Sequence, residues 1–110
     1  MAEIKYARTY SISLDANEEK TEVIKLEAPE GVTLKPVYML ISSTGKVRIK
    51  MWYDNDLRFD ITSDLLPPDE LGIKPEVEIT TGHRFVVDLK DESGAANTVT
   101  IYLEYVKVTR

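Results

Sequence analysis

Large apolar side chains alternate with polar ones along most of this chain. The even positions from 4 to 14 and the odd positions from 99 to 105 carry the larger side chains: Ile4, Tyr6, Arg8, Tyr10, Ile12 and Leu14, then Val99, Ile101, Leu103 and Tyr105. Successive side chains of a β-strand point to opposite faces of its sheet, so a period of two indicates one buried and one solvated face. The pattern returns between turn signals and predicts an all-β protein.

The alternation and the turns predict about eight strands. They are expected at Ile4–Leu14, Thr21–Ala28, Thr33–Ser42, Lys46–Tyr53, Leu57–Ile61, Glu76–Thr80, Arg84–Lys90 and Thr98–Val108. The third is apolar on both faces, which is typical of a central strand or of one covered on its outer side. Its Pro36 lacks an amide donor and should lie at an edge or at the start of the strand.

Residues 62–75 interrupt the pattern, because the two prolines of Leu65-Leu66-Pro67-Pro68 cannot continue a ladder of hydrogen bonds. A stretch of this length is typical of a crossover between sheets or of a functional loop. We expect its leucines to hold it against the end of the core.

These elements favour an antiparallel two-sheet β-sandwich with a jelly-roll-like strand order. An immunoglobulin-like sandwich is the alternative, although the Cys–Trp–Cys spacing of antibody domains is absent. The length of 110 residues suits a single domain over residues 1–110.

Composition limits the classes of function. The net charge of −5 disfavours non-specific binding to nucleic acid, and the absence of cysteine excludes disulfides and thiolate chemistry. No run of 18 apolar residues is present, and the first residues lack the pattern of a signal peptide. We therefore expect no membrane or nucleic-acid partner and a cytoplasmic or virion-associated location.

Charge is distributed unevenly. Residues 32–53 carry only basic charges, at Lys35, Lys46, Arg48 and Lys50, whereas residues 54–78 carry acids at Asp54, Asp56, Asp60, Asp64, Asp69, Glu70, Glu76 and Glu78. One interpretation is pairing of opposite charges across neighbouring strands. The other is packing between copies of the chain, with the basic face of one on the acidic segment of the next.

Catalytic motifs are not evident. His83 is the only histidine and follows Gly82, which is typical of an exposed turn residue. No cofactor motif is present, so we expect neither a cofactor nor an enzyme. The strongest metal-like pattern is a calcium candidate at Asp54, Asp56 and Asp60, since calcium prefers several oxygen ligands from a flexible loop. A solvated acidic turn explains the same residues.

Trp52 is the only tryptophan and falls on the predicted outer face of its strand, together with Arg48 and Lys50. Tyr102 falls on an outer face as well. Aromatic and arginine side chains are enriched at protein interfaces, so Trp52, Lys50, Arg48 and Tyr102 form a candidate protein contact. The alternative is a carbohydrate platform, in which Trp52 and tyrosines stack on sugar rings and calcium binds nearby.

Three stretches carry a resemblance to a known class of protein. They are Ser43-Thr44-Gly45-Lys46-Val47-Arg48-Ile49-Lys50-Met51-Trp52-Tyr53, Thr81-Gly82-His83-Arg84-Phe85, and Asp91-Glu92-Ser93-Gly94-Ala95-Ala96-Asn97 with the strand that follows. Over about 65 residues this succession of strands and turns resembles that of the small jelly-roll proteins of phage and viral particles, such as head-decoration and tail-associated proteins. The resemblance implies a non-enzymatic structural protein that acts as a trimer or larger ring, or with other structural proteins.

Overall fold

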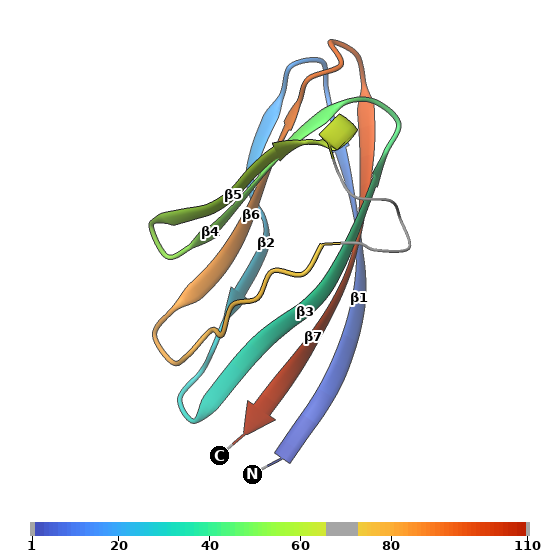
Figure 1. Ribbon diagram of the computed structural model, residues 1–110. Helices are drawn as coiled ribbons and strands as arrows, with labels where there is room; N and C mark the ends of the chain where they lie inside the picture. Colours follow the sequence, from blue (N-terminus) through green and yellow to red (C-terminus); the bar gives the residue numbers. More distant parts are fainter. Residues whose placement is uncertain (1, 66–72, 110) are drawn as a thin grey trace.

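The computed structural model describes residues 2–65 and 73–109, which form a sandwich of two β-sheets (Figure 1). The predicted all-β class is confirmed. The described strands are β1 (Ala2–Leu14), β2 (Glu19–Glu27), β3 (Val32–Ser43), β4 (Val47–Tyr53), β5 (Asp56–Thr62), β6 (Arg84–Asp91) and β7 (Asn97–Thr109). A short 3₁₀ turn covers Ser63–Leu65. The described residues contain no helix long and apolar enough to cross a membrane.

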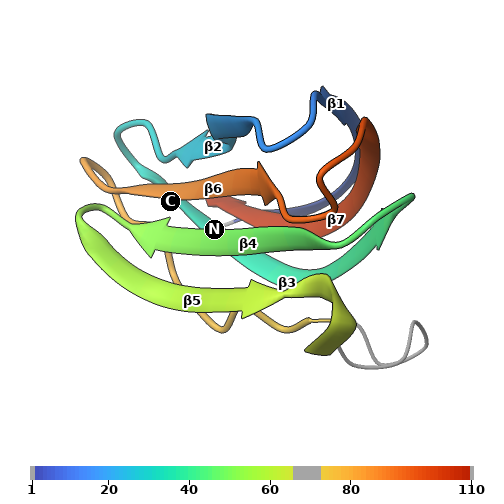
Figure 2. The same cartoon turned by 90° about the horizontal axis from the view of Figure 1, so that it is seen from above.

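The strands form two antiparallel layers (Figure 2). One sheet has the order β1-β7-β3 and the other β2-β6-β4-β5. β1 and β2 lie in different sheets, whereas the first two strands of an immunoglobulin-like sandwich share one. The immunoglobulin-like alternative is therefore wrong.

The predicted sixth strand is the main difference from the expectation. Residues 73–81 form no regular strand and instead make isolated bridges, with Ile73 opposite Met39 and Ile79 opposite Leu34. Glu76 has a left-handed φ of 54°, which interrupts the extended backbone between these two bridges. The segment still lies along β3. If the eight predicted segments are numbered from 1 to 8 in chain order, one sheet has the order 1-8-3-6 and the other 2-7-4-5. This is a jelly-roll order.

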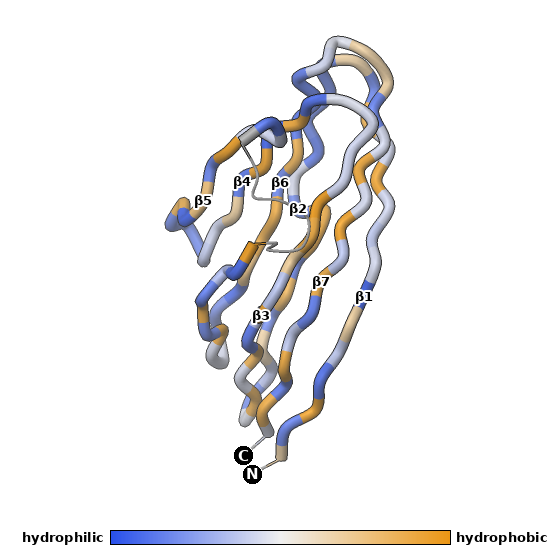
Figure 3. The backbone as a smooth tube through the Cα atoms, turned by 45° about the vertical axis from the view of Figure 1, so that its right-hand side comes forward, coloured by the Kyte–Doolittle hydropathy of each residue, from blue (hydrophilic) through white to orange (hydrophobic). Residues whose placement is uncertain are grey.

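The core lies between the two sheets. From Asn97 to Val106, β7 alternates between buried residues and residues that are partly or fully exposed. Figure 3 shows the alternation of hydrophobic and hydrophilic residues along β7. Its inner residues Val99, Ile101 and Leu103 are fully buried, and they face a layer that includes Ile49 and Phe85. β3 is not central, because it ends the order β1-β7-β3 and, of the described residues, 73–81 alone bridge to its other side. β6 lies inside its sheet, between β2 and β4, and its outer-face Val86 is buried as well as its two inward neighbours.

Three of the four sheet edges are protected against pairing with another strand. β3 has Pro36 and a register shift, as its predicted edge position allows, and is bridged by residues 73–81. Register shifts also interrupt the pairing of β2 with β6 and of β4 with β5. β1 differs, because it pairs with β7 from Ala2 to Leu14 without a shift, and no described strand pairs with its other side. Bulges, prolines and covering segments are the usual protection of exposed edges.

Candidate interaction surfaces

Trp52 lies in a groove on the outer face of the four-stranded sheet, as the strand pattern predicts. The groove has a volume of about 310 Å³, and its lining includes Arg84, Val86 and Asp88. The indole Nε1–H donates to Asp88 Oδ2 at 2.8 Å, which fixes the half-buried ring on the sheet. Asp88 Oδ1 also accepts from the amide of Glu22 at 2.9 Å. One carboxylate therefore holds both the Trp52 ring and the irregular part of β2.

Arg48 and Lys50 share this outer face with Trp52. Arg48 binds Asp60 on β5 through two hydrogen bonds, Nε to Oδ1 at 2.8 Å and Nη2 to Oδ2 at 2.7 Å. This bond raises the pKa of Arg48 and lowers the pKa of Asp60. Lys46 pairs with Asp64 at 3.9 Å. Basic and acidic segments thus meet within one chain, as the first interpretation of the charge distribution predicts.

Tyr102 lies on β7, and therefore in the other sheet. Its hydroxyl donates to Glu104 Oε1 at 2.7 Å, and this bond raises the pKa of Tyr102. Its side chain faces outward, because Ile101 and Leu103 on either side are buried. The outer faces of the two sheets point away from each other. Tyr102 and Trp52 therefore do not share one contact surface, and a contact through Trp52, Lys50 and Arg48 stays a prediction.

The three calcium candidates are not brought together. Asp54 accepts from the Arg84 amide at 3.0 Å, Asp56 pairs with Arg58 at 2.8 Å, and Asp60 is bound by Arg48. Within residues 2–65 and 73–109, no group of three or more His, Cys, Asp or Glu side chains is placed to hold a metal ion.

His83 is exposed in its turn, as expected, but it is part of a small cluster that the sequence did not indicate. Its ring stacks on Tyr53 with a centroid distance of 5.5 Å. Its Nδ1 lies 2.5 Å from Asp54 Oδ2, and this contact is the main cause of a lowered pKa of Asp54. The cluster joins the turn after β4 to the start of β6.

The loops at one end of the sandwich are joined by two buried polar side chains, Asp91 and Asn97, which we call the Asp91–Asn97 hub. Asp91 accepts hydrogen bonds from the amides of Asn17, Ser93 and Gly94 and from the side chain of Asn97, at 2.9–3.1 Å. Asn97 accepts from the Gly45 amide at 3.1 Å and donates to the Lys46 carbonyl at 3.1 Å. The hub therefore holds the loops that follow β1, β3 and β6.

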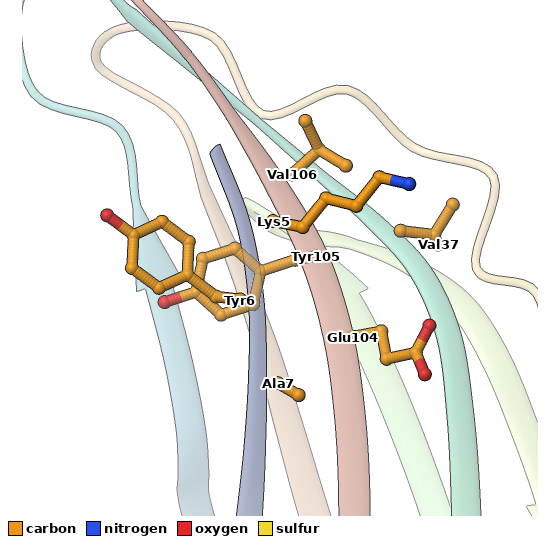
Figure 4. A pocket seen from close by; sticks show the side chains of 7 residues that line it. All are labelled: Lys5, Tyr6, Ala7, Val37, Glu104, Tyr105 and Val106. Carbon is orange, nitrogen blue, oxygen red and sulfur yellow. The ribbon is translucent and has the colours of Figure 1, made fainter. Parts of the chain in front are cut away.

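The other end of β1 is open on both faces. On the outer face, a hollow of about 360 Å³ lies above Ala7, between Lys5, Glu104 and Val37 (Figure 4). Its depth follows from the small side chain of Ala7, which stands opposite Glu104 in register. Val37 on its rim is 48% exposed.

On the inner face, Tyr6 stacks on Tyr105 with a centroid distance of 5.2 Å, on the opposite side of the sheet from the hollow (Figure 4). Beside this pair, a groove of about 300 Å³ opens between the two sheets, and we call it the seam groove. Its floor includes the core residues Leu26 and Leu34, and its rim includes Arg8. The N-terminal half of β1 thus has apolar surface that β2 does not cover.

Comparison of the chain with protein-family models, curated proteins and solved structures finds no match.

Proposed function

We propose that this protein is a non-enzymatic structural module that self-associates, of the kind that builds virion or other particle shells. The observation that carries the proposal is β1, the only described edge that is straight, free of proline and without a covering segment. Ile4, half exposed at 50%, lies on the same strand, and Val37, at 48%, borders the adjacent hollow. Exposed straight edges pair with further strands, and most proteins block them. The jelly-roll strand order supports the same proposal, since such sandwiches form capsid domains.

The geometry favours β1 over the Trp52 face as the place of association. Arg48 and the Trp52 indole are already bound within the chain, to Asp60 and Asp88. The backbone groups along the free side of β1 face no strand among the described residues. A strand of a second molecule can therefore form more new hydrogen bonds with β1 than with the Trp52 face.

The test is the absolute mass in solution, measured by size-exclusion chromatography with light scattering at two protein concentrations. A stable oligomer, whether a dimer, a trimer or a larger ring, supports the proposal. A mass of 12.5 kDa at both concentrations, which is the mass of one chain, contradicts it.

A second candidate function is carbohydrate binding at the Trp52 groove. The observation in its favour is the groove itself, where one indole ring is surrounded by the hydrogen-bonding side chains of Asp54, Arg84 and Asp88. Sites of this kind combine an apolar platform with a few polar groups that fix orientation. The test is titration with a panel of neutral oligosaccharides, followed by Trp52 fluorescence and by calorimetry.

Trp52→Ala separates the two candidates. In the carbohydrate case it abolishes the heat of binding and leaves the mass in solution unchanged. If self-association uses the Trp52 face instead of β1, the same substitution lowers the mass. If self-association uses β1, the mass of Trp52→Ala equals that of the wild type.

A further inference from the structure

The hydrogen bonds at the hub end show which backbone groups of β1 are free. Thr98 on β7 directs both of its backbone groups toward the β3 side, because its carbonyl accepts from the Thr44 amide and its amide donates to Thr44 Oγ1. Its partner on β1 is Ser13. Antiparallel pairs alternate between bonded and non-bonded, so Ser13 belongs to a non-bonded pair and points its own amide and carbonyl to the free edge.

A second contact agrees with this assignment. The Lys20 ammonium of β2 donates to the Ser13 carbonyl at 2.7 Å, and therefore caps the free edge at that point. The pairing of β1 with β7 has no shift, so the same direction recurs at every second residue. Among the described residues, both the amide and the carbonyl are unoccupied at this edge at Glu3, Lys5, Ala7, Thr9 and Ser11.

We propose that β1 pairs antiparallel with β1 of a second copy of this chain, about a two-fold axis that passes beside Ala7. The inference rests on the proposed self-association and specifies its surface and register. Ala7 is the centre of the free stretch from Glu3 to Ser11, so this register pairs every residue of that stretch whose backbone groups point to the edge. The three-stranded sheets of the two copies then form one continuous sheet.

The side chains of β1 fit this register. On the inner face Arg8 stands opposite Tyr6 of the second copy. This arrangement repeats a contact within one chain, where the Arg8 guanidinium donates to the Tyr10 hydroxyl. Ile4 stands opposite Tyr10, so the half-exposed isoleucine meets an aromatic ring. On the outer face Lys5 stands opposite Thr9, and Ala7 opposite Ala7.

Neighbouring registers are less favourable. A shift by one pair in one direction brings Arg8 opposite Arg8, and a shift by two in the other brings Lys5 opposite Lys5. Like charges that stand directly opposite each other destabilise a strand pair. A shift that brings Tyr6 opposite Tyr6 avoids this repulsion but leaves Ser11 without a partner. Of these registers, only the one centred on Ala7 both pairs the whole stretch from Glu3 to Ser11 and places no like charges opposite each other.

The first test is Ala7→Pro. Proline at this position removes an amide that points to the free edge and leaves the bonds of β1 to β7 intact. We expect the dimerisation constant to fall at least about 30-fold, since the substitution acts twice at the centre of the pair. Ala7→Val is the matched control, because it adds similar bulk, keeps the amide and should dimerise like the wild type. The thermal midpoint of each variant checks that the monomer remains folded.

The second test measures the register and does not depend on Ala7→Pro being folded. The chain has no cysteine, so nitroxide labels are placed singly at Ala7→Cys, Thr9→Cys and Ser11→Cys. In the proposed pair the two residues at position 7 have Cα atoms about 5.5 Å apart, and those at position 9 about 14 Å apart. We expect spin–spin broadening to be strongest at position 7 and weakest at position 11.

The outcomes separate this inference from the function on which it rests. A dimer that Ala7→Pro dissociates, with the strongest broadening at position 7, supports both. An oligomer that Ala7→Pro leaves intact, or broadening strongest at position 9 or 11, overturns the β1 pair and leaves self-association standing. A monomer at every concentration overturns both, and the free edge would then suit a strand of a different protein.

Discussion

The boundary between β1 and β2 has two very different ends. At the hub end, Asp91 holds the loop between the two strands through the amide of Asn17. There Lys20 also reaches across from β2 to the Ser13 carbonyl. At the other end the seam groove separates the strands, and Ile4 and Arg8 are exposed. The closed end is held mainly by hydrogen bonds between loops, and the open end leaves apolar surface uncovered. The contacts that stabilise the domain and the uncovered apolar surface therefore lie at opposite ends of the same boundary.

The largest expected effect comes from breaking the closed end. Asp91→Ala leaves the buried side-chain amide of Asn97 without its acceptor, together with the part-buried backbone amides of Asn17, Ser93 and Gly94, and an unsatisfied buried donor is costly. We expect the thermal midpoint to fall by about 10 °C. Thermal unfolding followed by circular dichroism measures it. Asp91→Asn is the control, since it retains one acceptor oxygen and should lose less. Equal midpoints for Asp91→Ala and the wild type would contradict this role.

Acid should weaken the same end. The hydroxyl of Ser93 and the amide of Asn17 donate to Asp91 and hold its pKa far below the ordinary value. A carboxylate whose pKa is lowered on folding stabilises the protein above its unfolded pKa of about 4, and this stabilisation is lost as the pH falls toward the folded pKa. The free energy of unfolding should therefore decrease from pH 5 to pH 2. Denaturant titrations at each pH measure it, and Asp91→Asn should show a shallower decrease.

A smaller effect is expected from Lys20→Ala, which removes the ammonium that caps the Ser13 carbonyl. The loss of one exposed hydrogen bond costs about 0.5 kcal/mol. Ser13 lies beyond the stretch from Glu3 to Ser11 that the proposed register pairs, so we expect self-association to equal that of the wild type. Lys20→Arg keeps a donor and should resemble the wild type in both measurements. A change of association in Lys20→Ala would contradict the register centred on Ala7.

The smallest effect on stability is expected at the open end. Ile4 is 50% exposed, so Ile4→Lys should change the free energy of unfolding of the monomer by no more than about 0.5 kcal/mol. Equilibrium denaturation at a low protein concentration measures it. A loss as large as that of Asp91→Ala would show that the open end contributes to the monomer as much as the closed end does.

The sequence predicted the class of fold because burial in a sandwich alternates along each strand. The inward positions from Val99 to Tyr105 are buried as expected, and Trp52 is on an outer face. The segment at 76–80 misled the prediction, since alternation does not reveal the left-handed backbone of Glu76. Leu66 and Leu71, expected to hold the crossover, lie outside the described residues.

The candidate site was predictable only in part. Alternation places Trp52 and Tyr102 on outer faces. The sheet to which each belongs depends on the strand order, which the alternation of residues does not reveal. The role of Asp91 was missed, although an aspartate followed two residues later by Ser93 is a recognised turn pattern. The free edge of β1 depends on what lies beside the strand, and no pattern within residues 2–14 records that.

The register of β1 with β7 also determines how the domain responds to mechanical force. Ala2 stands opposite Thr109, and the two strands run antiparallel from that point. A pulling force applied across these two residues is carried by the terminal pair alone, so the ladder opens one pair after another. A force applied along β1 against a neighbouring strand loads all of the hydrogen bonds between them together. A shell that suspended this domain between Ala2 and Thr109 would peel it apart, whereas one that held it along the length of β1 would keep it folded under tension.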